Sequence, residues 1–285
     1  MDFRKIIADL SAMGLNLYDF ALYTPDGIAS HRFIPCSNCH NSYSVAKVFI
    51  MTALGMLYDD GKLLPEDPVS RYLSLPQNAD PRFHSVLIDH ALTHRIGFDK
   101  GFLDIDTEDP TTYPSEDYLS IVLSRPLAHV PGTHSQYSDA AFYLLSRLIA
   151  AVAGEHADVL LNRRLLRPLR FHEAAWSRCP HDHPIGATGL YIGAQDMVKL
   201  GALYLEGGVY DGQRLLSREW TQMAIDRQYE LHPLAPGNPD SDLTGKWGMY
   251  GQLLAFSRKK HFAIALHAHM DIRRDGSKLI EYFSA

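Results

Sequence analysis

The first thirteen residues carry apolar side chains at helical spacing. The positions that would share one face are Phe3, Ile6, Ile7, Leu10 and Met13. Apolar and aromatic residues then become dense over 17–23, and a turn sequence at 24–27 separates them from a second strand-like run at 28–33. The pattern predicts an amphipathic helix followed by a β-hairpin.

Two longer apolar runs with helical spacing follow, over 44–61 and 140–153. The middle of the chain alternates short helical runs with proline-rich loops such as 108–114, without a clear strand signal. Near the end, 252–256 and 262–269 have β-like patterns and 278–283 has a helical one. Strands at both ends with helices between them predict an α+β fold, in which both termini build one antiparallel sheet around an inserted, mainly helical region.

We expect this pattern to form one domain over 1–285, with its sheet part at about 1–43 and 210–285 and its helical part at about 60–205. A chain of 285 residues with 46% hydrophobic and 21% charged positions is globular rather than disordered. The formal net charge is −6 and the longest basic run is 258–260, so nothing in the charge pattern favours a nucleic-acid partner.

The N-terminal residues, the length of the apolar runs and the number of cysteines indicate in which cellular compartment we expect the protein. Residues 1–10 include charged side chains and lack the apolar segment of a secretory signal. The apolar runs at 45–58 and 140–154 are too short for a bilayer about 30 Å thick and contain Lys47 and Arg147. Three cysteines, an odd number, do not suggest a disulfide framework. We expect a cytoplasmic protein that does not contact a membrane.

The first candidate for chemistry is Ser44-Val45-Ala46-Lys47, at the start of an apolar helix. On a helix this spacing places the hydroxyl and the amine on one face, about 5–6 Å apart at Cβ. A serine in the first turn can turn its backbone N–H toward a developing oxyanion, and a neutral lysine can take the serine proton. The same four residues are also typical of an ordinary helix start with a solvated lysine.

The second candidate lies at the entrance of the helix over 140–153. The turn-rich segment 131–139 brings Tyr137 and Asp139 to this helix start. A phenol beside a lysine can act as a general acid or base. A buried tyrosine next to a helix-capping aspartate would have the same sequence pattern.

Together these segments resemble a known family. Ser44-Val45-Ala46-Lys47 is similar to the S-x-x-K motif of penicillin-binding proteins and serine β-lactamases, and Tyr137-Ser138-Asp139 to their Y-x-N motif. The segments 91–97 (Ala-Leu-Thr-His-Arg-Ile-Gly), 131–133 and 189–208 resemble stretches of the class C β-lactamase branch, which includes esterases and D-peptidases. The order and spacing match from about Ser44 to Trp220.

The resemblance implies a β-lactamase/transpeptidase-like fold and an acyl-enzyme mechanism. In that mechanism Ser44 attacks a carbonyl carbon, Lys47 and Tyr137 exchange protons, and water releases the acyl group. The resemblance implies no metal and no organic cofactor, and it implies a small ester, amide or β-lactam-like substrate. It does not indicate an oligomeric state.

The third motif of the family, K-T-G or H-x-G on a strand beside the serine, has two possible positions. The literal match is Lys246-Trp247-Gly248. The alternative aligns Gly248-Met249-Tyr250-Gly251-Gln252 with the G-x-H-G-Q sequence of some amide- and ester-cleaving relatives. We prefer the second register, which would place Tyr250 near the substrate and a backbone N–H around Gln252 in the oxyanion hole.

Two departures from the family pattern affect the expected chemistry. Neither register supplies the threonine that would help to hold a substrate carboxylate, so penicillin recognition should be weak. Asp139 replaces the usual asparagine, and an ionised carboxylate only accepts hydrogen bonds. It also favours a charged Lys47, in which case Tyr137 becomes the better candidate base.

A separate motif, Cys36-Ser37-Asn38-Cys39-His40, matches the haem c attachment pattern and contains possible metal ligands. The sequence leaves three hypotheses. They are a cytoplasmic serine hydrolase for an ester or small amide, a catalytically idle family member that binds a ligand or acts as a scaffold, and a haem or metal carrier that uses Cys36, Cys39 and His40. We favour the first.

Overall fold

Two units make up the chain in the computed structural model, which describes all of residues 1–285. We call the first the sheet unit; it contains Met1–Val45, Leu166–Ala175 and Leu190–Ala285. We call the second the helical unit; it contains Ala46–Leu165 and Trp176–Gly189. None of the helices is both long enough and apolar enough to span a membrane.

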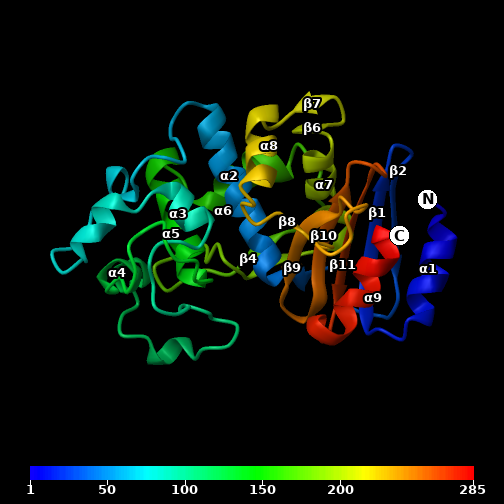
Figure 1. Cartoon of the computed structure of the whole chain (residues 1–285), viewed down its shortest axis with the longest axis horizontal. Coiled ribbons are helices and arrows are strands. Elements are labelled where there is room, and N and C mark those ends of the chain that lie inside the picture. The colour runs from blue at the N-terminus through cyan, green and yellow to red at the C-terminus, as the bar shows by residue number, and fades with distance from the viewer. The chain divides into compact units, whose positions relative to one another are not determined.

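Strands from both ends of the chain form the main sheet of the sheet unit (Figure 1). Its antiparallel order is β2-β1-β11-β10-β9-β8. The bounds are β1 (Leu17–Thr24), β2 (Gly27–Arg32), β8 (His232–Pro233), β9 (Thr244–Gly248), β10 (Gln252–Ser257) and β11 (Phe262–Ala268). In the middle of the sheet β1 pairs with β11, with Ala21 opposite Ala265, so the two ends of the chain depend on each other for their pairing.

Alternate residues of the central strands face two different helical layers. One face carries Phe20, Ile264 and Leu266, which pack in a core with α1 (Phe3–Ala12) and α9 (Ile272–Ser284). The other face carries Leu254 and Ala263 and meets α7 (Ala194–Leu205) at Gly201. A Cβ there would lie 3.0 Å from Leu254 and 3.2 Å from Ala263.

Smaller elements complete the sheet unit. A short strand β3 (His40–Asn41) pairs with β5 (Leu190–Ile192) and leads into the 3-10 turn η1 (Tyr43–Val45). The other elements are β6 (Val209–Tyr210), β7 (Gln213–Arg214), α8 (Arg218–Asp226) and the 3-10 turn η6 (Met249–Gly251). The strand β4 (Ala175–Trp176) crosses from one unit to the other along the chain.

The helical unit is built around α2 (Ala46–Asp59), which packs against α5 (Asp139–Ala153). Residues 46–57 of α2 are all buried, which explains why its sequence is apolar on every side. Gly154 ends α5 with a left-handed φ of 72°, a conformation that glycine adopts without strain. The remaining helices are α3 (Ile88–Leu92), α4 (Tyr118–Ser124) and α6 (Ala157–Leu161).

The predicted α+β fold is confirmed, with an antiparallel sheet and a helical region. The opening helix, the hairpin, the helices at 44–61 and 140–153 and the late strands are all present. The last helix starts earlier than predicted, at Ile272, because the Asp271 side chain accepts hydrogen bonds from the first backbone N–H groups. The middle of the chain, which carries no clear strand signal, contains two short strands, β4 and β5. They have two and three residues, too few to show an alternating pattern.

Candidate functional site

Lys47 is a fully buried cation in the first turn of α2. Its Nζ lies 2.8 Å from Oδ1 of Asp139 and donates a hydrogen bond to the carbonyl oxygen of Ala187 at 2.9 Å. Asp139 is itself 7% exposed, so the pair is shielded from water. A buried charge is tolerated only when it is paired and hydrogen-bonded, and both conditions are met here. The nearby carboxylate of Asp139 favours the charged form of the lysine.

Tyr137 lies beside this cation, at the end of the loop before α5. The Nζ atom of Lys47 is 4.8 Å from the centre of the Tyr137 ring and 5.9 Å from that of Phe142. Tyr137 is 45% exposed, whereas Lys47 is sealed off. The Tyr137 side chain is therefore accessible to solvent, and the Lys47 side chain is not.

His94 fixes the loop that carries Tyr137. Its ring lies 4.4 Å from the Tyr137 ring, centre to centre, and its Nδ1 accepts a hydrogen bond from the backbone N–H of Ser138 at 3.2 Å. The carbonyl oxygen of His94 accepts another from the N–H of Gln136 at 2.8 Å. His94 has a left-handed φ of 55°, an uncommon conformation for a residue other than glycine. No sequence pattern marks His94 as a functional residue, although it lies within the family-like segment 91–97.

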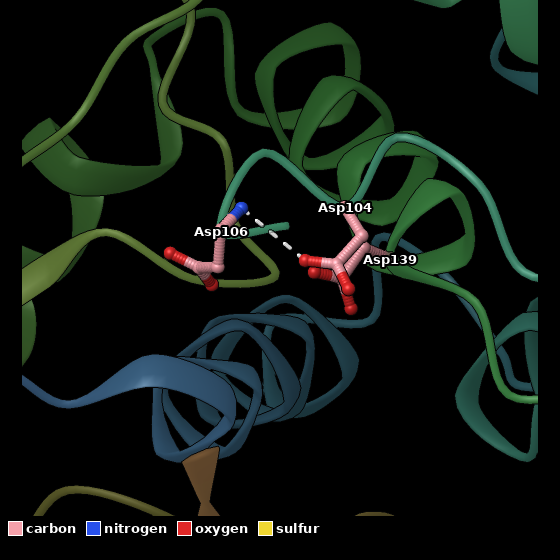
Figure 2. Close-up of side chains that lie close together, drawn as sticks. All are labelled: Asp104, Asp106 and Asp139. Carbon is pink, nitrogen blue, oxygen red and sulfur yellow. Dashed lines mark hydrogen bonds between the residues drawn. The ribbon is translucent and has the colours of Figure 1, made fainter. Parts of the chain in front are cut away.

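Two further carboxylates lie next to Asp139. Asp104, Asp106 and Asp139 each have a ligand oxygen within 4.8 Å of the others, and the backbone N–H of Asp106 donates to Asp104 at 3.2 Å (Figure 2). Burial raises the pKa of Asp106, and the charges of Asp139 and Asp104 add to the rise, while Thr188 and Lys47 oppose it. Three carboxylates of this kind could hold a hard cation. Because Asp139 is already paired with Lys47, the three carboxylates form a negatively charged region beside the lysine. No motif marks the loop that carries Asp104 and Asp106, so the sequence did not predict that these residues belong to the site.

Ser44 lies in η1, which runs directly into α2 three residues before Lys47. Within the sheet unit, β9 passes very close to η1 at Gly248. A Cβ on Gly248 would lie 2.4 Å from the carbonyl oxygen of Ser42 and 3.2 Å from Cβ of Tyr43, so only glycine fits. Gly248 belongs to both proposed registers of the third motif.

The residues proposed around Gly248 lie in different surroundings. Lys246 is buried in an ion pair with Glu230. Trp247 packs toward α9, where a Cβ on Gly276 would lie 3.4 Å from its ring. Tyr250 is 39% exposed, and its ring lies 5.4 Å from that of Tyr43 in η1.

The two residues after Tyr250 shape the turn between β9 and β10. Gly251 has a φ of 97°, and a Cβ there would lie 2.7 Å from Met270. The Gln252 side chain is buried and donates to the carbonyl oxygens of Met249 and Ala268, while its oxygen accepts from the N–H of Ala268. Of the side chains on β9, η6 and β10 that we proposed for substrate binding, Tyr250 lies beside the serine segment. Lys246 is in an ion pair, and Trp247 and Gln252 are used in packing and hydrogen bonding.

The cysteine motif lies elsewhere in the sheet unit. Cys39 lines a cavity of about 510 Å³ together with Asp19, His172 and Glu173. Its Sγ is 3.5 Å from a carboxylate oxygen of Glu173. Burial, followed by the hydrogen bond and charge of Glu173, raises the pKa of the Cys39 thiol to about 11. This thiol is therefore protonated near neutral pH and is a poor nucleophile.

Comparison with known proteins shows the family of this chain. The family model described as Beta-lactamase matches residues 38–279. The chain belongs to the β-lactamase family. The match includes the serine, lysine and tyrosine segments and the late strands, as the sequence resemblance predicted.

Individual relatives are more distant. A Bacillus subtilis protein named as a penicillin-binding protein, PbpX, is 26% identical over 172 residues, which cover 59% of this chain and 41% of PbpX. This chain therefore aligns with less than half of that relative. A Bacillus anthracis structure named as a 6-aminohexanoate-dimer hydrolase superimposes with a TM-score of 0.80 at 15% identity, covering 100% of this chain and 81% of the other.

A D-stereospecific amidohydrolase from Streptomyces sp. gives a TM-score of 0.71 at 16% identity, covering 98% of this chain and 96% of the other. At these identities the two structural matches establish the fold alone.

Proposed function

We propose that this β-lactamase-family hydrolase cleaves an ester or a small amide through an acyl-enzyme on Ser44. The proposal is carried by one observation, the fully buried Lys47 ammonium held beside the accessible Tyr137. In this proposal the Tyr137 hydroxyl exchanges the proton of Ser44, and the charge of Lys47 opposes the negative charge that develops during the reaction. Ser44 precedes that cation by three residues of chain.

The roles follow from the charge of Lys47. A lysine that is already an ammonium ion cannot accept the serine proton, so Tyr137 takes it as Ser44 Oγ bonds to the carbonyl carbon. The same proton then goes to the leaving alcohol or amine. In the second half, water gives a proton to Tyr137 and attacks the acyl carbon, and the proton returns to Ser44. Lys47 keeps its charge throughout.

The surrounding charges favour neutral or cationic substrates over carboxylates. Lys246, the cation that the literal third motif would supply, is paired with Glu230. Asp104 and Asp106 add negative charge beside Lys47. A β-lactam carries a carboxylate that such a field repels. We therefore expect short-chain esters and small amides, including amides of D-amino acids, to react faster than nitrocefin.

The test is covalent labelling of the full chain with a fluorophosphonate, read by intact mass and peptide mapping. We expect one adduct on Ser44, which Ser44→Ala abolishes together with p-nitrophenyl ester hydrolysis. Ser42→Ala, a serine two residues earlier, serves as the matched control and should keep both. An adduct on another residue, or ester turnover that survives Ser44→Ala, would contradict the mechanism. Rapid nitrocefin hydrolysis would contradict the substrate preference.

A second candidate function is a catalytically idle family member that binds a ligand or acts as a scaffold. The ion pair of Asp139 with Lys47, where relatives have asparagine, is the observation that favours it. This alternative predicts no adduct at high fluorophosphonate concentration, although a D-amino-acid amide would still raise the melting temperature.

A further inference from the structure

Two histidines on separate strands lie side by side inside the sheet unit, outside the site described above. His40 is on β3, and His267 is on β11 and fully buried. Their ring centres are 5.2 Å apart and the ring planes are tilted by 44°. By strand alternation His267 shares its face of the sheet with Ala263, the face that α7 covers.

The His267 ring is held by a carboxylate. Its Nδ1 lies 2.8 Å from Oδ1 of Asp19, and the second oxygen of Asp19 accepts a hydrogen bond from the backbone N–H of Ala194 at 3.0 Å. Because the carboxylate can only accept, the Nδ1 of His267 carries the hydrogen. The Nε2 of a neutral ring then carries a lone pair, and this atom is buried without a hydrogen-bond partner.

In the His40 ring, too, one nitrogen is hydrogen-bonded and the other has no partner. It is hydrogen-bonded to the backbone of Ser37, and its Nε2 is also buried without a partner, so the bond to Ser37 uses Nδ1. The Tyr18 ring lies 4.9 Å from the His40 ring and limits its rotation. Both imidazoles thus have an anchored Nδ1 and a buried, unpaired Nε2.

We propose that the Nε2 atoms of His40 and His267 bind one divalent transition-metal ion of the zinc class. Two imidazoles on a tetrahedral zinc have ring centres about 5 Å apart, because each Zn–N bond is about 2.0–2.1 Å. An Nδ1–H that donates to a carboxylate or a backbone carbonyl is the usual support of a metal-binding histidine. Water completes the coordination of the ion.

A second histidine pair in the chain provides a matched control. His156 and His183 of the helical unit have ring centres 4.6 Å apart, and each has a buried Nδ1 without a partner. Burial, followed by the nearby charge of Arg147, lowers the pKa of His183 to about 4. The Arg147 charge repels a metal cation, whereas at His40 the charge of Asp19 opposes that of Arg32, so the second pair should not bind zinc.

The experiment measures Zn²⁺ binding to the chelator-treated full chain by competition with a chromophoric chelator. We expect one ion per chain, with binding weakened at least tenfold in His267→Gln and in His40→Gln. His183→Gln and the double variant Cys36→Ser/Cys39→Ser should bind as the wild type does. Absence of binding by the wild type, or loss of binding in either control, would overturn the proposal.

A measurement on the unmodified protein covers the case in which a variant does not fold. Co²⁺ added to the chelator-treated wild type should give visible d–d bands without a thiolate-to-cobalt charge-transfer band, because the ligands are nitrogen and oxygen. A thiolate band would place the metal on the cysteine motif and overturn the assignment to the histidine pair.

Discussion

Lys47 and Asp139 depend on one another because both are buried. If Asp139 is replaced by alanine, the lysine charge remains without a counter-ion in a site that water does not reach. We expect Asp139→Ala to lower the free energy of unfolding by about 3–5 kcal/mol. Asp139→Asn keeps a hydrogen-bond acceptor and should cost clearly less. Urea unfolding of both variants measures this, and equal losses would show that an uncharged acceptor does not replace the carboxylate of Asp139 at all.

His94 acts on the proposed chemistry through Tyr137, as a positioning residue. His94→Ala removes the stacked ring and the acceptor for the Ser138 N–H, so the phenol loses its fixed place. Misplacement of a reacting group by about 1 Å can cost about 100-fold in rate. We expect kcat for an ester to fall about 10- to 100-fold with little change in KM. His94→Asn, which keeps an acceptor, should recover part of this loss, and His84→Ala, at an exposed position, should change neither constant.

The raised pKa of Asp106 makes the free energy of unfolding depend on pH, and its direction sets the sign of that dependence. Its folded-state pKa is raised above the ordinary 3.8, first by burial, so the folded protein holds this proton more tightly than the unfolded chain does. The contribution of Asp106 to the free energy of unfolding is therefore present at low pH and is lost as the pH rises through the folded-state pKa. Asp106→Asn should stabilise more at pH 7 than at pH 4. Asp109→Asn, at an exposed carboxyl whose pKa is lowered by Thr111, should show no such gain.

At the scale of elements, β9 and η1 pack closely against each other because Gly248 has no side chain. Gly248→Ala would place a methyl group 2.4 Å from a backbone oxygen, and neither strand nor turn can yield without moving the serine segment. Overpacking of this kind costs about 1–3 kcal/mol, and we expect the upper end. Gly237→Ala has no atom within 4 Å of the new Cβ and should be neutral. Thermal unfolding of both variants tests this, and equal melting temperatures would contradict it.

At the scale of the whole molecule, the chain crosses between the sheet unit and the helical unit four times. We predict from the sequence that residues 1–285 work as one domain. If so, calorimetry should show a single transition whose calorimetric and van't Hoff enthalpies agree. Two separated transitions would show that the units unfold independently. Gly248→Ala, which alters only the sheet unit, would then shift one of them alone.

The sequence alone determined the α+β order of elements and the family, because both depend on local patterns. The spacing of apolar residues sets helix and strand, and the order of Ser44, Lys47 and Tyr137 along the chain resembles the family motifs. The charge state of Lys47, the buried pairing of Lys246 with Glu230 and the role of His94 depended on the tertiary structure. Each of these is an interaction between residues 16 to 92 positions apart, and its strength depends on burial, which no local pattern records. The pairing of His40 with His267 belongs to the same group, because β3 and β11 meet only in the folded protein.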